Sequence, residues 1–139
     1  MSKTLITIET TINAPVEKVW KAWTTPADIV QWNAASDDWH TTKSENDLRT
    51  GGKFSSRMEA KDGSMGFDFW GIYDEVKPNE LIASTMGDGR KLTVNFISKG
   101  DQTEVKEAFE AENENSIEMQ KNGWQSILNN FKKHTESLK

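Results

Sequence analysis

The chain has 139 residues, the length of one ordinary domain, and 22 acidic against 17 basic residues give a net charge of −5. Cysteine is absent, which excludes disulfides, thiolate nucleophiles and cysteine-ligated metal sites. The only histidines are His40 and His134, for which we expect structural roles, so a multi-histidine metal site is disfavoured. The acidic balance argues against nucleic acid and anionic membranes as partners. Since no signal-peptide or membrane-spanning run is found, we expect a single cytoplasmic domain over residues 1–139, without a cofactor.

The first third of the chain predicts a strand followed by two short helices. Alternating isoleucines predict a strand over about residues 4–12. Pro15 then favours the first turn of a helix. Thr25 as N-cap, with Pro26 directly after it, predicts a second helix that ends near Trp32.

From about residue 37 to 110, short alternating runs are separated by turn signals. Turns every 8–15 residues predict an antiparallel meander of about six strands, with the clearest hairpin at Asp62-Gly63. The strand at 66–76 has two apolar faces. We favour the face of Phe67, Phe69 and Tyr73 as the inward one because it carries more aromatic area; the alternative is the face of Trp70, Ile72 and Val76.

Residues 101–118 hold seven acidic residues against one lysine. One interpretation is a solvated edge strand and loop, and the other is a docking surface for a basic partner. Glu107 lies within this segment and shares parity with Val105 and Phe109. It is therefore either a buried carboxylate, able to orient a ligand or act as an acid, or a solvated residue where the strand leaves the core.

The region 115–138 has the most regular helical pattern in the chain. Gly123 interrupts it, either to let a strand approach closely or to leave room in the groove beneath. An antiparallel sheet with one apolar face needs a cover, and this helix is the only element long enough. We therefore predict an α+β fold, in which a curved sheet of about six to seven strands wraps around the C-terminal helix. A single helix cannot fill a wide groove, so a cavity is expected between them.

Several motifs follow one another along the chain. They are Ile12-Asn13-Ala14-Pro15, Val19-Trp20, Thr25-Pro26, Trp32, Asp47–Phe54, Asp62-Gly63, Gly71–Pro78 and Gly123-Trp124 with Leu128. In this order they resemble the helix-grip (SRPBCC or START-like) superfamily, and within it the branch named after the activator of the heat-shock protein 90 ATPase, specifically the C-terminal domain of that activator. The match runs from about residue 6 to 135. The resemblance implies the helix-grip fold, which serves lipid carriers, hormone receptors, cyclases and co-chaperones.

The leading functional hypothesis is a protein that binds an apolar or amphipathic, lipid-like small molecule between sheet and helix. The tryptophans at helical spacing form either plain core or part of a ligand cage. Tyr73, Glu107 and Arg57 are candidates for orienting a ligand through polar contacts. The predicted ligand-binding residues are Trp20, Phe54, Met58, Phe69, Tyr73, Met86, Phe96, Glu107, Phe109, Trp124 and Leu128.

Two other functions remain open. One is a co-chaperone-like module that contacts a heat-shock protein 90 type chaperone, for example through residues 101–118. The other is a cyclase- or hydrolase-type enzyme that uses Glu107; no nucleophile motif supports it, so we lean against an enzyme. Both a monomer and a homodimer fit the sequence.

Overall fold

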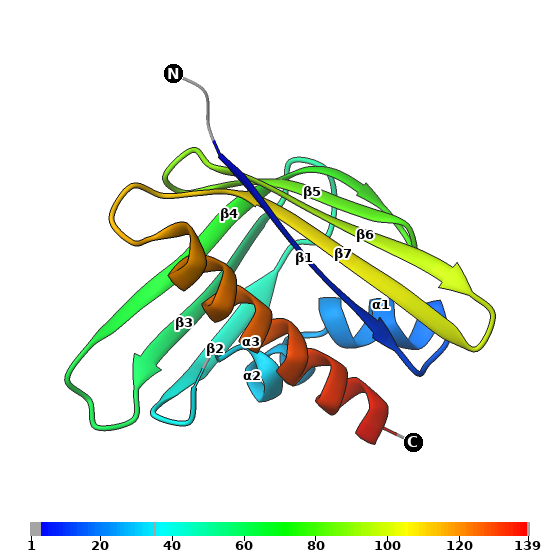
Figure 1. The fold of residues 1–139 in the computed structure, drawn as a ribbon, viewed down its shortest axis with the longest axis horizontal. Helices are drawn as coiled ribbons and strands as arrows, with labels where there is room; N and C mark the ends of the chain where they lie inside the picture. Colours follow the sequence, from blue (N-terminus) through cyan, green and yellow to red (C-terminus); the bar gives the residue numbers. More distant parts are fainter. Residues whose placement is uncertain (1–3, 35, 139) are drawn as a thin grey trace.

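The structure is a computed structural model that describes residues 4–34 and 36–138. Seven antiparallel strands form one curved sheet in the order β1-β7-β6-β5-β4-β3-β2, and a long helix crosses its concave face (Figure 1). This arrangement confirms the predicted α+β helix-grip architecture. The elements are β1 Leu5–Ile12, α1 Val16–Thr24, α2 Pro26–Trp32, β2 Trp39–Asn46, β3 Lys53–Ala60, β4 Gly66–Lys77, β5 Leu81–Met86, β6 Lys91–Lys99, β7 Gln102–Glu110 and α3 Ile117–Ser137.

Helices α1 and α2 close one end of the groove. The indole Nε1 of Trp32 donates a hydrogen bond of 3.1 Å to the carbonyl of Ala22, which ties α2 to α1. The rings of Trp23 and Trp32 each pack edge-on against Phe131 of α3, with centroids 4.8 Å apart. Aromatic packing therefore fills this end of the interior.

Helix α3 begins at an N-cap serine. The hydroxyl of Ser116 accepts a hydrogen bond from the backbone N–H of Met119, which satisfies one of the free donors of the first turn. The helix packs chiefly along β1, and its buried face carries Leu128 and Phe131. Among the described residues, no helix is both long and apolar enough to cross a membrane.

Strand β4 points the predicted face toward the core over part of its length, and it also contains a register shift that the sequence pattern did not predict. Tyr73 is buried and Phe69 packs against the core, as predicted, but Phe67 near the start of the strand is 48% exposed. Trp70 on the opposite face is 39% exposed. The register with β5 shifts between Tyr73 and Glu75. A bulge of this kind reverses the sides of the strand, which explains why Val76 also packs against the core.

The interpretation of the acidic segment, residues 101–118, as an edge strand is wrong. Strand β7 lies between β1 and β6, so both of its sides are hydrogen-bonded, and the edges of the sheet are β1 and β2. The acidic side chains are also dispersed. Glu104 lies 3.2 Å from Lys99 and 3.3 Å from Lys106, whereas Glu107 is buried on the other face.

Candidate functional site

A cavity of about 470 Å³ lies between the concave sheet, helix α3 and the two short helices. Its volume falls within the range of about 300–1,000 Å³ of small-molecule sites. Aromatic rings line it from β3, β4 and α3, and aliphatic side chains of β5 and β6 form its floor. Those floor residues are Ile82, Leu92 and Val94.

The aromatic wall is a continuous chain of ring contacts. Phe54 lies 5.2 Å from Tyr73 and 5.8 Å from Phe69, measured between ring centroids. Phe69 meets Trp124 at 6.0 Å, and Trp124 stacks on Phe109 at 3.9 Å with an interplanar angle of 14°. The wall thus links β3 to α3 across the opening of the groove.

Gly71 makes this wall possible, because it faces Phe54 in the β3–β4 register. A Cβ at position 71 would lie 2.7 Å from the ring of Phe54 and 2.6 Å from the carbonyl oxygen of Thr85. Real Cβ atoms do not approach other atoms so closely, so the ring of Phe54 can keep this position only while residue 71 is glycine.

Gly123 has the opposite role, since it leaves space. It lines the cavity in the middle of α3, one helical turn before Ile127, which also lines it. A Cβ added at this position would meet no atom within 4 Å. Of the two roles expected for this glycine, the structure shows the one that leaves room in the groove.

Glu107 is the buried carboxylate of the site. It lines the cavity and is only 6% exposed, in a row between Ile8 of β1 and Val94 of β6. Burial raises the pKa of its carboxyl group to about 8. Among the described residues, none forms a hydrogen bond or ion pair with this carboxyl group, and burial alone causes the change. At neutral pH the group is therefore mostly protonated in the empty cavity.

Tyr73 is a second polar group on the cavity wall. Its side chain is buried, and burial raises the pKa of its hydroxyl to about 12, so it stays protonated at any physiological pH. No hydrogen-bond partner for this hydroxyl is present in residues 4–34 and 36–138. It can therefore donate to or accept from a bound molecule.

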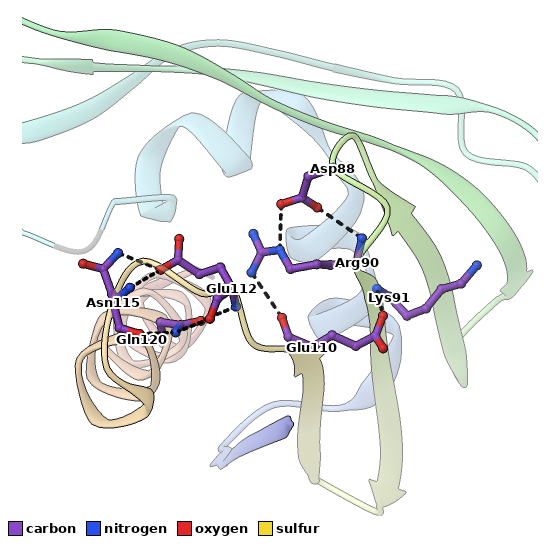
Figure 2. A network of polar contacts seen from close by, with 7 residues as sticks. All are labelled: Asp88, Arg90, Lys91, Glu110, Glu112, Asn115 and Gln120. Carbon is purple, nitrogen blue, oxygen red and sulfur yellow. Dashed lines mark hydrogen bonds and ion pairs between the residues drawn. The ribbon is translucent and has the colours of Figure 1, made fainter. Parts of the chain in front are cut away.

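A polar network lies near the start of α3 (Figure 2), and two of its members, Arg90 and Glu112, line the cavity. Arg90 donates from Nε to Asp88 at 2.7 Å and from Nη1 to the carbonyl of Glu110 at 3.1 Å. Gln120 accepts from the backbone N–H of Glu112 at 2.9 Å and donates to the carbonyl of Asn115 at 2.8 Å. These bonds hold the β5–β6 turn, the end of β7 and the first turns of α3 together.

The structure brings part of the predicted ligand-binding set to the cavity and leaves the rest in the core around it. The predicted residues on the cavity wall are Phe54, Met58, Phe69, Tyr73, Glu107 and Trp124. The predicted residues outside its lining are Trp20, Met86, Phe96, Phe109 and Leu128.

Several residues that line the cavity were not predicted as ligand contacts. Trp23 and Trp32 were included only among the tryptophans that form either plain core or part of a ligand cage. Trp39 and Phe67 were not considered as ligand contacts, although both line the cavity. Trp39 and Phe67 pack on each other at 5.9 Å. Both residues alternate with polar neighbours, which indicates a strand. This pattern does not show which ends of the strands face the groove.

The remaining polar candidates lie away from the cavity. Arg57 is on the outer face of β3, where it contacts Glu59 at 3.1 Å and Asp68 at 3.5 Å, so the prediction that it orients a ligand is wrong. His40 is exposed on β2. His134 lies 3.0 Å from Asp28 and joins α3 to α2. The described residues contain no cluster of three or more His, Asp or Glu able to hold a metal.

Solved structures closely resemble this one. A solution structure of an AHSA1-like protein from Aeromonas hydrophila is 46% identical, with a TM-score of 0.90 over 96% of this chain and 93% of that one. A protein from Cytophaga hutchinsonii is 53% identical, with a TM-score of 0.83 over 94% and 91% of the two chains. A crystal structure of a protein from Chromobacterium violaceum shares the fold at 22% identity, with a TM-score of 0.86 over 97% and 99%.

Family membership follows from a second comparison. A search of curated proteins found no match. The sequence model of one family, however, matches residues 13–136, nearly the whole chain. This agrees with the resemblance seen in the motifs and with the AHSA1-like structure from Aeromonas hydrophila. The chain belongs to the family described as Activator of Hsp90 ATPase homolog 1-like protein.

Proposed function

We propose that this protein binds an apolar or amphipathic small molecule in the cavity between the sheet and α3. The observation that carries the proposal is the open space beneath Gly123, walled by aromatic rings and holding two polar groups, Glu107 and Tyr73, without partners among the described residues. Burial of a ligand's apolar surface supplies affinity at about 25 cal/mol per Å². The few polar groups then fix its orientation.

The first experiment is native mass spectrometry of the purified protein, followed by solvent extraction to identify any bound molecule. Decanol is then titrated while tryptophan fluorescence is recorded, because Trp23, Trp32 and Trp124 line the cavity. We expect either a defined extra mass or saturable decanol binding. If no molecule co-purifies with the protein and decanol does not bind, the proposal is contradicted.

Gly123→Leu provides the specific test. The Cβ of the new side chain meets no atom within 4 Å and residue 123 lines the cavity, so the leucine occupies part of the cavity and we expect decanol binding to weaken at least tenfold. Lys121→Leu is the matched control, since it places the same side chain at an exposed position of the same helix. Trp124→Ala alone would not discriminate, because losing a large aromatic side chain costs about 3–5 kcal/mol of stability. Equal affinity of both leucine variants would locate the binding elsewhere.

A second candidate function is association with a chaperone of the Hsp90 type, which the description of the family favours. The dispersed acidic side chains of β7 give no support to the docking surface considered at residues 101–118. The test is the ATPase rate of the chaperone at saturating concentrations of this protein. A stimulated rate would support this function, and an unchanged rate would contradict it.

A further inference from the structure

We propose that the ligand of this cavity carries a protonated amine, which forms an ion pair with the carboxylate of Glu107. The inference rests on the proposed function and specifies the chemical class of the ligand. Its basis is the position of one acidic side chain, which is more than nine-tenths buried and lines a cavity that is otherwise mostly apolar.

The direct neighbours of Glu107 on the sheet are all apolar. Its neighbours across the strands are Ile8 and Val94, and those along β7 on the same face are Val105 and Phe109. Opposite them, α3 contributes Trp124, Ile127 and Leu128 to the same interior. No described group supplies a positive charge or a hydrogen-bond donor to this carboxyl group.

The other charged side chains that line the cavity already have partners. Arg90 is held by Asp88 and the carbonyl of Glu110, as Figure 2 shows. Glu112 accepts hydrogen bonds from Asn115 at 2.7 and 2.8 Å, and Glu45 lies 3.3 Å from Lys43. Within the described chain, Glu107 is therefore the charged residue of the cavity lining that still lacks a partner.

This charge distribution selects among amphipathic ligands. Three of the four charged lining side chains are acidic, and the guanidinium of Arg90 is engaged, so a ligand carboxylate would find no free cation. A protonated amine supplies the missing charge. An ion pair with hydrogen bonds is stronger in such a water-poor site than the hydrogen bond of a neutral alcohol.

Binding of the amine also moves a proton. The carboxyl group of Glu107 is mostly protonated in the empty cavity at pH 7, because burial raises its pKa to about 8. The ammonium group keeps its own proton, and the carboxyl group loses its proton to the buffer as the ion pair forms. Close to one proton is therefore released for each amine bound.

The experiment compares decylamine, decanol and decanoate, each below its micelle concentration, with the wild-type protein and Glu107→Gln at pH 7. Calorimetry in two buffers of different ionisation enthalpy measures affinity and proton release together. We expect the wild type to bind decylamine at least tenfold more tightly than decanol, with proton release, and to bind decanoate most weakly. Glu107→Gln should lose both the preference for decylamine over decanol and the proton release.

The outcomes separate this inference from the proposed function. Saturable decanol binding that Gly123→Leu weakens, together with no preference for the amine in the wild type, would overturn the amine inference alone. An amine preference that persists in Glu107→Gln would overturn it as well. If no probe binds to the wild-type protein and no molecule co-purifies with it, the proposed function and this inference both fail.

Discussion

The buried carboxyl group of Glu107 leads to a strong prediction about how the stability of the protein depends on pH. In the unfolded chain its carboxyl group ionises near the ordinary pKa of 4.5, whereas in the folded protein it keeps its proton until about pH 8. As pH rises from 4.5 to 8, the unfolded state releases this proton and the folded state does not. The folded state therefore loses stability across this window, and the loss is complete above pH 8.

The size of the effect follows from the two pKa values. The difference between 4.5 and about 8, at about 1.36 kcal/mol for each pKa unit, corresponds to roughly 4–5 kcal/mol. This is an upper limit, because water in the adjoining cavity would stabilise the ionised form. Glu107→Gln has nearly the same shape and no ionisable group. The variant should match the wild type at pH 4 and exceed it by several kcal/mol at pH 8.5.

Urea unfolding of both proteins between pH 4 and 9, followed by tryptophan fluorescence, measures this difference. All other titrating groups are common to the two proteins, so they cancel in the difference between the curves. The predicted signature is a gap that widens with pH and levels off above pH 8. A gap that is constant from pH 4 to 9 would refute the reasoning, because it would mean that Glu107 ionises at the same pH in the folded and unfolded states.

Three substitutions test the local packing, each by urea unfolding. Gly123→Ala should raise the free energy of unfolding by up to about 1 kcal/mol, because alanine is the better helix former and its Cβ enters open space; a loss would contradict this. Gly71→Ala should lower it by at least about 1–3 kcal/mol, since the new Cβ overlaps the ring of Phe54; an unchanged value would show that the ring moves freely. Thr135→Val should raise it by about 1 kcal/mol, because the buried Thr135 hydroxyl has no hydrogen-bond partner among the described residues; a decrease would indicate that it has one.

The elements of the fold were predictable because each depends on a local pattern. Alternation and turn residues located the strands, and Ser116 to Ser137 follow the helical rhythm that was expected. The position of β7 was not predictable in the same way. Its pairing with β1 joins segments about a hundred residues apart, and no local signal in either strand encodes it. The acidic composition of the segment therefore suggested an edge, although β7 is internal.

The candidate site was predictable only in part, for a similar reason. The parity of β7 allowed Glu107 to be buried but left a solvated position open, since parity does not show whether a strand stays on the core. Phe54 and Trp124 were correctly expected near the groove, and they line the cavity. Trp20 shares their character but packs edge-on against Phe96, at 5.2 Å, outside the cavity lining. Which aromatic ring faces the free space depends on how the ends of the groove close.

Two of the residues that depart from what a stable core requires line the same cavity. Glu107 is a carboxyl group buried among apolar neighbours, and Gly123 lies in the middle of the longest helix, where alanine would be more stable by about 1 kcal/mol. Leucine and alanine at these positions would fill the interior and stabilise the fold. Departures from local rules that converge on one cavity are typical of a functional site. A bound molecule that fills the space under Gly123 and neutralises Glu107 would relieve both costs together, so its binding should raise the unfolding temperature most strongly above pH 7.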